Sequence, residues 1–361
     1  MRPLTRFLTA GIFSATCLGV GGERIEAKER IYYLIPTLID EFQTESQRMI
    51  EGIFGVLNYD VISADADGNP DLQSRQIRSA IADRPAAIIL NAVDSFSIGK
   101  TLHEIRPSRT PVLVYDRMLP LEYDFDFASI SDAESIGRLG ASKVIEILQL
   151  DRNDQSHKTI LQIVGDPGDS YSLRVLQGFR TAFKDYKNSE VITVPAIGWE
   201  PANARKAAED ILKTNPKIDI IYCHSADLAA AVIPLVAERI KQGVIKVAAI
   251  TGAPIGLENL KNGLQAFEIE QPLYAQAYGL ALGLQQIKKR ETGNGVALTD
   301  GRCDMLGARG NLVEHGRVLQ FEGKLITADD LANRSKLGLW GDLTRPVRSA
   351  DEIKNLECGG R

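Results

Sequence analysis

The chain has 361 residues, of which 44% are apolar and 25% charged, and its formal net charge is −5. This is the composition of a globular protein, and the length exceeds what one hydrophobic core usually serves, so we expect two domains. The acidic balance and the lack of a basic stripe in the sequence argue against nucleic-acid binding.

The N-terminus has the pattern of a secretory signal peptide. Two arginines within the first six residues precede a small and apolar run, residues 7–22, which is too short to cross a bilayer comfortably. Residues 1–27 are therefore predicted to be removed on export, which leaves a soluble mature chain. Cys17 raises the alternative of a lipid anchor, although the three residues before it fit that signal poorly.

Strand and helix patterns alternate through the first third of the chain. Short apolar runs bounded by turn residues predict strands, and apolar residues at helical spacing predict helices between them. The predicted strands are 31–36, 59–64, 86–90, 112–115 and 125–130, and the predicted helices are 44–57, one that starts at Asn69, and 96–105. This order predicts a parallel sheet covered by helices on both faces.

The same alternation then repeats. The predicted strands are 159–164, 191–196, 218–223, 246–250 and 264–269, and the predicted helices are 135–148, 173–186, 201–212, 228–241 and 256–262. Two successive α/β units of similar size imply two lobes with a cleft between them. A further helix is predicted at 276–287, and residues 293–316, rich in glycine and polar residues, read as a long excursion.

The segment between the two units carries a family resemblance. The apolar run 112–115 is followed by Asp116, Arg117 and Met118, then by a short acidic turn and the next strand. This resembles the periplasmic sugar-binding proteins, most of all the xylose-binding members. Later landmarks keep their order and rough spacing, so the likeness extends from about Glu29 to Asn333.

The resemblance implies an α/β fold of the type I periplasmic-binding-protein architecture. In this architecture two Rossmann-like lobes, each a parallel sheet flanked by helices, are joined by a hinge. It places residues 28–132 and 272–316 in the first lobe, and residues 133–271 and 317–334 in the second. Residues 317–327 resemble the last strand of the family. Residues 335–361 lie beyond the likeness, and the sequence assigns them no function.

Candidate ligand contacts in the first lobe follow its strands, because ligands of open α/β sheets bind beyond the carboxyl ends of the strands. An Asp beside an Arg offers a hydroxyl-rich ligand both acceptors and donors. The candidates are Asp40, Phe42, Gln43, Asp94, Asp116 and Arg117. Two alternatives stay open: Asp40 and Asp94 could merely cap helices, and Asp116 with Arg117 could form a surface ion pair.

The second lobe offers a different set of candidates through the resemblance. Trp199, in a Gly-Trp-x-Pro element, would stack on the apolar face of a sugar ring, with packing within its loop as the alternative. The other candidates are Asp169, Tyr171, Ser225, Asp227, Thr251 and Gln271.

This chain departs from the family pattern at three of these positions. Tyr171 stands where the family has Asn, Ser225 begins a pair that is Asn-Asp in the family, and Thr251 lies near a family carboxylate. Fewer carboxylates than in the relatives predict a ligand other than xylose.

The cysteines and histidines suggest neither a metal nor a cofactor. Cys223 lies in an apolar run and is expected in the core, while Cys303 and Cys358 lie in late, loop-like sequence and could pair in an oxidising compartment. The sequence has no C-x-x-C pair and no phosphate-binding or nucleophile-elbow motif. A glycosidase pair of carboxylates stays open on composition alone.

The leading hypothesis is a monomeric, periplasmic solute-binding protein without catalytic activity. It would capture a monosaccharide, xylose-like or related, between its lobes and deliver it to the membrane permease of an ABC transporter. One alternative is a sugar-sensing receptor subunit for a chemoreceptor or a histidine kinase. Another is a sugar-active enzyme.

Overall fold

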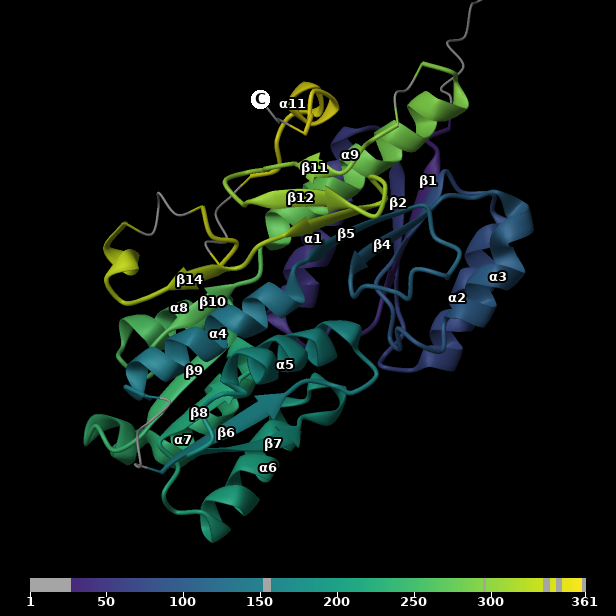
Figure 1. Ribbon diagram of the computed structural model, residues 1–361. Helices are drawn as coiled ribbons and strands as arrows, with labels where there is room; N and C mark the ends of the chain where they lie inside the picture. Colours follow the sequence, from purple (N-terminus) through teal and green to yellow (C-terminus); the bar gives the residue numbers. More distant parts are fainter. Residues whose placement is uncertain (1–26, 152–156, 295–296, 334–337, 342–345, 359–361) are drawn as a thin grey trace, which may run out of the picture.

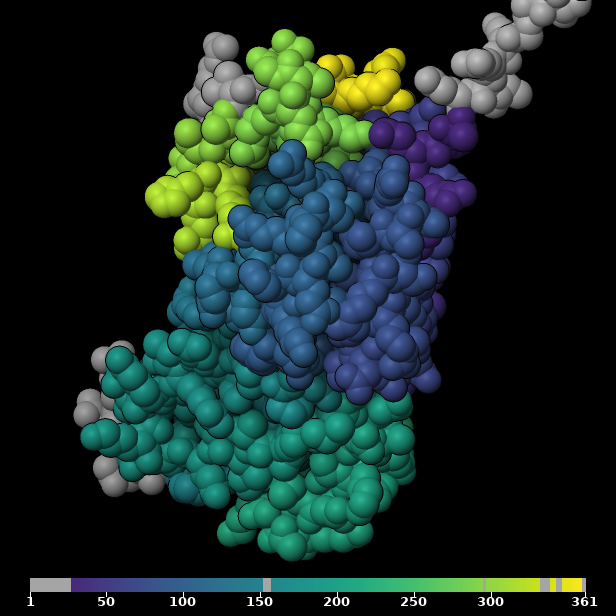
Figure 2. Space-filling view, turned by 90° about the vertical axis from the view of Figure 1, so that its right-hand side faces the viewer, coloured from purple at the N-terminus to yellow at the C-terminus, as the bar shows by residue number. Residues whose placement is uncertain are grey.

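The structure is a computed structural model that describes residues 27–151, 157–294, 297–333, 338–341 and 346–358. Two α/β lobes lie one above the other, each built around its own sheet (Figure 1). Figure 2 shows the first lobe, purple and blue, in direct contact with the teal second lobe. Cys17 and the rest of the predicted signal peptide, apart from Ala27, lie outside the described residues.

The first lobe contains an eight-stranded sheet in the order β11-β12-β13-β5-β4-β3-β1-β2. Neighbours from β13 to β2 run parallel, and β11 and β12 extend the sheet as antiparallel strands. The bounds are β1 Arg30–Ile35, β2 Asp60–Asp65, β3 Ala87–Leu90, β4 Val112–Asp116, β5 Phe127–Ser131, β11 Gly301–Arg302, β12 Gly310–Val313 and β13 Val318–Phe321.

Helices cover both faces of this sheet. One face is covered by α1 (Glu41–Val56) and α9 (Leu273–Glu291), which also pack against each other. The other face is covered by α2 (Pro70–Ala82) and α3 (Gly99–Ile105). The short helix η1 (Arg106–Ser108) continues α3. The central strands β3, β4 and β5 are buried along their whole length, which explains why their sequences are mostly apolar.

The second lobe has a six-stranded sheet in the order β14-β10-β9-β8-β6-β7, in which only β14 is antiparallel. Its strands are β6 Lys158–Val164, β7 Ser189–Pro195, β8 Ile220–Cys223, β9 Lys246–Thr251, β10 Glu268–Glu270 and β14 Lys324–Ile326. Its helices are α4 Ala133–Ile147, α5 Ser170–Phe183, η2 Ile197–Trp199, α6 Pro201–Thr214, α7 Ala226–Lys241, α8 Pro254–Lys261 and η3 Asp330–Asn333.

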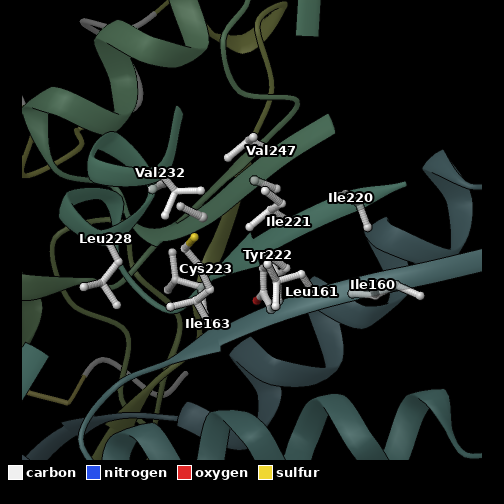
Figure 3. Close-up of a cluster of buried hydrophobic side chains, with 14 of the residues drawn as sticks. Ile160, Leu161, Ile163, Ile220, Ile221, Tyr222, Cys223, Leu228, Val232 and Val247 are labelled. Atoms are coloured by element: carbon white, nitrogen blue, oxygen red, sulfur yellow. The ribbon is translucent and has the colours of Figure 1, made fainter. Parts of the chain in front are cut away.

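The core of the second lobe is formed by side chains of β6, β8 and β9 with the helices around them. Figure 3 shows Leu228 and Val232 of α7 beside the residues of β6 and β8. Cys223 is fully buried in this cluster as a free thiol, so its predicted core position is confirmed.

The predicted final strand over 317–327 is wrong as a single element. It is two strands in different sheets: β13 pairs with β5 in the first lobe, and β14 pairs with β10 in the second. Gly323, between them, leaves no room for a side chain, because a Cβ there would lie 2.5 Å from a side-chain atom of Ile136. The assignment of all of 317–334 to the second lobe is therefore wrong for Val318–Phe321.

The late part of the chain contains regular elements and a disulfide. The predicted excursion 293–316 contains β11 and β12. Residues 335–361, called the tail from here on, contain α11 (Ala350–Lys354), which packs on α9 and α1. A disulfide joins Cys303 to Cys358 and ties this segment to the first lobe. None of the helices in the described part of the chain is long and apolar enough to cross a membrane.

Several helices begin earlier than their apolar pattern indicated. α1 starts at Glu41 rather than residue 44, and α5 at Ser170 rather than residue 173. In each case an aspartate at the end of the preceding loop accepts a hydrogen bond from the first helical turn, Asp40 from Gln43 and Asp169 from Tyr171. These caps lie in the loops that follow strands, where the candidate ligand contacts also lie.

Candidate ligand-binding site

A cavity lies between the lobes, where the carboxyl ends of both sheets meet. Its volume is about 20 Å³, which is room for roughly one water molecule. Every predicted contact except Asp94 lines it: Asp40, Phe42, Gln43, Asp116, Arg117, Asp169, Tyr171, Trp199, Ser225, Asp227, Thr251 and Gln271. A larger ligand therefore enters only when the lobes separate or the lining side chains move.

Asp116, at the end of β4, is held by two amides. Its Oδ1 accepts from Gln271 Nε2 at 2.5 Å, and its Oδ2 accepts from Asn91 Nδ2 at 3.3 Å. The amide of Asn91 also donates to Gln43 Oε1 at 3.1 Å. Burial, with the nearby charge of Asp169 in addition, raises the pKa of Asp116 to about 7.

Arg117 connects the two halves of the cavity. Its Nη1 donates to the carbonyl oxygens of Ala92 at 2.9 Å and Val93 at 3.3 Å, both in the loop after β3. Its Nε lies 3.0 Å from Asp169 Oδ2 of the second lobe, although this N–H is not aligned for a hydrogen bond. Asp116 and Arg117 are both buried, so the alternative that they form an ion pair at the surface is wrong.

Asp169 organises the second-lobe side of the cavity. Its Oδ1 accepts from the Tyr171 backbone N–H at 2.8 Å, and its Oδ2 accepts from Trp199 Nε1 at 3.0 Å. Burial raises the pKa of Asp169, and Arg117 partly offsets this effect. The indole of Trp199 packs directly on Gly165, where a Cβ would lie 2.1 Å from the ring. Any side chain at position 165 would collide with the indole, so the ring can lie here only because residue 165 is glycine.

Three residues of the lining have backbone angles that side chains disfavour. The φ angles are +63° at Asp116, +60° at Trp199 and +105° at Thr251. For a β-branched residue such as Thr251 this is a clear outlier. Strained backbone is costly and concentrates at functional sites, where the surrounding structure maintains it. This cluster is independent support for a ligand site here.

Asp40 is both a helix cap and a residue of the cavity lining, the two roles that the sequence left open. Its carboxylate caps α1 by accepting from Gln43 N at 2.7 Å, and it also lines the cavity. Ser225 caps α7 in the same manner through Leu228 N at 3.2 Å. The N-termini of α1, α5 and α7 therefore meet at the cavity.

Asp94 is the one predicted contact that the structure does not bring to the cavity. Its Oδ1 accepts from Phe96 N at 2.8 Å and Ser97 N at 3.1 Å, so it stabilises the turn that leads into α3. The next residue, Ser95, was missed. Its N–H donates to Gly168 O at 3.0 Å, and its Oγ accepts from Ser170 N at 3.3 Å, both in the second lobe.

Asn91 and Ser95 lie in the loop at the carboxyl end of β3, as Asp116 lies at the carboxyl end of β4. The rule that predicted Asp116 could therefore have found both. Neither lines the cavity: Ser95 joins the lobes beside it, and Asn91 positions Asp116.

Four of the predicted contacts that line the cavity are carboxylates: Asp40, Asp116, Asp169 and Asp227. Asp227, one position later than in the family pattern, lies in the first turn of α7. Burial, followed by the charges of Asp40 and Glu41, raises the pKa of Asp227 to about 7. With Arg117 as the single cation, four aspartates and one arginine give the lining a formal charge of −3 when all are ionised. Among the described residues, no cluster of His, Cys, Asp and Glu side chains is arranged to hold a metal ion.

Two parallel-sheet lobes that enclose a polar cavity define a type I periplasmic-binding-protein fold. The model of the family described as periplasmic binding protein domain matches residues 31–291, so the chain belongs to this family. The predicted family and fold class are thus confirmed.

Curated relatives include the D-allose-binding periplasmic protein of Escherichia coli (strain K12). It is 26% identical over 153 residues, which cover 42% of this chain and 48% of that protein. The multiple sugar-binding periplasmic receptor of Rhizobium radiobacter is 20% identical over 169 residues, covering 43% and 48%. The chain thus spans about half the length of the curated relatives that it matches.

Solved structures match over more of the chain. The periplasmic binding protein component of the arabinose ABC transporter from Shewanella sp. ANA-3, bound to L-arabinofuranose, has a TM-score of 0.73 at 16% identity, covering 91% of this chain and 99% of that one. The Caulobacter myo-inositol binding protein has a TM-score of 0.72 at 19% identity, covering 86% and 97%. At these identities the likeness concerns the fold.

Proposed function

We propose that this chain binds a neutral monosaccharide or polyol between its lobes and closes on it. The observation that carries the proposal is the composition of the lining, which combines four aspartates, one arginine and three aromatic rings. Carboxylates accept from sugar hydroxyls, a guanidinium donates to them, and aromatic rings cover the apolar face of the sugar. Phe42 comes from the first lobe, and Tyr171 and Trp199 come from the second, so rings are available on both sides.

The charge of the lining selects against acidic ligands. Four aspartates face one arginine in the lining, so its ionised carboxylates repel sugar acids and sugar phosphates, while neutral sugars meet acceptors for their hydroxyls. The hydroxyl of Tyr171 is buried without a partner among the described residues, and a ligand hydroxyl would satisfy it. A xylose-like pentose remains the finer prediction. The names of the relatives and of the similar structures contain D-allose, arabinose and myo-inositol, which supports the wider class of neutral monosaccharides and polyols.

Membership of the family supports a proposal for the cellular role. We place the mature protein in the periplasm as a monomer without catalytic activity, with the permease of an ABC transporter as the partner of the closed form. The relative from Rhizobium radiobacter is named a receptor, which favours sugar sensing as the second candidate role. Removal of residues 1–27 on export is tested by the intact mass of the protein that an exporting host secretes.

A thermal-shift screen tests the ligand class. The panel holds D-xylose, L-arabinose, D-allose and myo-inositol, with D-galactose and D-galacturonate as a neutral and acidic pair. A ligand at 100 times its Kd stabilises the folded state by about 2.7 kcal/mol, which raises the melting temperature. We expect a shift with at least one neutral sugar and none with the acid. A preference for the acid, or hydrolysis of a glycoside panel, would contradict the proposal.

Substitutions in the cavity then test the site. Arg117→Ala leaves buried acceptors unpaired, and Trp199→Ala removes the stacking face. Each is expected to weaken binding roughly ten- to a hundredfold in isothermal titration, Trp199→Ala at least as much as Arg117→Ala. Ile197→Ala is the control, because Ile197 lies two residues before Trp199, is 51% exposed and does not line the cavity. Wild-type affinity in both cavity variants would show that the site is assigned wrongly.

A further inference from the structure

Trp340 lies in the predicted tail, outside the residues that match the family, and yet it is fully buried. Its indole Nε1 donates to the carbonyl oxygen of Thr251 at 2.5 Å, and its backbone N–H donates to Glu270 Oε1 at 3.1 Å. Its own carbonyl oxygen accepts from the hydroxyl of Tyr274 at 3.2 Å. The ring meets Phe42 edge-on, with 5.7 Å between centroids. All polar groups of Trp340 are thus engaged.

The residues on either side of Trp340 pack in the second lobe. Leu339 is buried in a small cluster with Leu257 and Leu260 of α8 and Ile326 of β14. Gly341 lies against the backbone of Gly252, where a Cβ would be 2.3 Å from the carbonyl oxygen. Only a residue without a side chain fits this close approach.

The chain that follows packs on the first lobe. A side-chain methyl of Val347 lies against Gly52 of α1, and Arg348 N donates to the hydroxyl of Tyr278 on α9 at 2.8 Å. Beyond them, α11 and the disulfide at Cys358 hold the chain there. The chain crosses between the lobes at β5–α4, β10–α9 and β13–β14, and the tail contacts both lobes in addition to these crossovers.

Trp340 supports one cavity residue from each lobe. Thr251, from the second lobe, has the strained φ of +105°, and its carbonyl oxygen accepts from both Trp340 Nε1 and Gln271 N, the latter at 3.1 Å. Phe42, from the first lobe, lies between the edge of Trp340 and the stacked ring of Tyr115. Because both Thr251 and Phe42 line the cavity, their positions depend on the tail.

We infer that residues 339–341 form an interlobe brace that stabilises the closed arrangement and positions Phe42 and Thr251 for the ligand. This inference rests on the proposed function, since it concerns the same cavity. Trp340 is a positioning residue, because it acts through its two neighbours and does not line the cavity itself. Contacts made to both lobes in the closed form bias the equilibrium towards that form, and they thereby favour any ligand that binds it.

The test compares two variants of Trp340 with a matched control in the full mature chain. Trp340→Phe keeps a ring against Phe42 but loses the donor to Thr251 O, and Trp340→Ala loses both. Tyr278→Phe is the control, because it removes the hydrogen bond between the tail and α9, which lies within the first lobe. Spin labels at Lys100→Cys on α3 and Lys206→Cys on α6, both exposed, report the distance between the lobes.

Without ligand, both Trp340 variants are expected to shift the distance distribution towards longer, open values, while Tyr278→Phe matches the wild type. In titrations with D-xylose, L-arabinose, D-allose and myo-inositol, Trp340→Phe is expected to raise the Kd of each sugar that binds by about tenfold, with little change for Tyr278→Phe. Melting curves show whether each variant is folded, and Trp340→Phe carries the test if Trp340→Ala unfolds.

Wild-type distances and affinities in Trp340→Phe would overturn the brace, and so would equal changes in Tyr278→Phe. If no sugar binds even the wild type, the proposed function fails, and the distances measured without ligand still decide the brace.

Discussion

In the first lobe, the polar residues of the cavity are bonded to groups from several parts of the chain. Asp116 is held by Asn91, from the loop after β3, and by Gln271, from a crossover between the lobes. In the second lobe, Asp169 is held by the first turn of its own helix and by Trp199 from the next loop. The hydrogen bonds that hold Asp169 therefore lie within one lobe, whereas the bond from Gln271 to Asp116 depends on how the lobes are placed.

The lobes also differ in what stabilises them. The first lobe is cross-linked by Cys303–Cys358 and covered by the tail, while the second has a free, buried Cys223. The second lobe buries a carboxylate, Glu268, whose oxygens accept from Gly252 N at 3.0 Å and Gln265 Nε2 at 2.6 Å. We therefore expect reductant to act on the first lobe, and Glu268 to make the stability of the second lobe depend on pH.

The largest expected effect comes from the disulfide. The two cysteines are 55 residues apart, and a cross-link closing a loop of this length stabilises the folded state by about 4 kcal/mol in the chain-entropy model. Replacing Cys303 and Cys358 together by Ser should lower the unfolding free energy by roughly that amount. Hydrogen exchange should show the loss of protection in β11, β12, α9 and α11. An equal loss throughout the second lobe would contradict the contrast between the lobes.

Glu268→Gln should change how stability depends on pH. Burial raises the pKa of Glu268 from 4.5 to about 8, so between these values the folded state binds a proton that the unfolded state lacks. Stability therefore falls as pH rises through this window, by up to about 1.4 kcal/mol per pH unit for one group, and is level above it.

The side-chain amide that Glu268→Gln introduces needs an acceptor, and Gln265 Oε1, which has no partner among the described residues, can supply it when the Gln265 amide turns over. The variant should lose this part of the pH dependence and be more stable than the wild type at pH 8. Urea unfolding from pH 5 to 8 measures both. Glu238→Gln, at a side chain that is 77% exposed, is the control, and an unchanged slope in Glu268→Gln would refute the claim.

The smallest expected effect separates a structural aspartate from the cavity aspartates. Asp94→Ala removes the acceptor for Phe96 N and Ser97 N and should lower stability by about 1 kcal/mol. Its sugar affinity should stay within about twofold of the wild type, because Asp94 does not line the cavity. Asp94→Asn keeps an acceptor and should restore stability in thermal melts. A tenfold loss of affinity in Asp94→Ala would return Asp94 to the ligand site.

The sequence predicted the two α/β units from local patterns, since alternating strands and helices produce parallel sheets. The first-lobe contacts followed from the rule that the carboxyl ends of parallel strands meet at one edge, whereas the second-lobe contacts came from the resemblance to the periplasmic sugar-binding proteins. Asp116, at the end of β4, and Asp169 and Ser225, in the loops after β6 and β8, were brought together as expected. Asp94 also follows a strand and still lies outside the lining, because its side chain turns to accept from Phe96 N and Ser97 N. A place after a strand does not by itself determine where a side chain points.

The tertiary structure alone decided the features that depend on contacts between distant segments. The change of sheet at Gly323, the pairing of Cys303 with Cys358, and the burial of Trp340 between the lobes have no periodic signature in the sequence. Each is determined by the space that other parts of the fold leave, as the close approaches at Gly323 and Gly341 show. Local propensity predicts which elements form, whereas packing between the lobes determines where residues 339–341 lie.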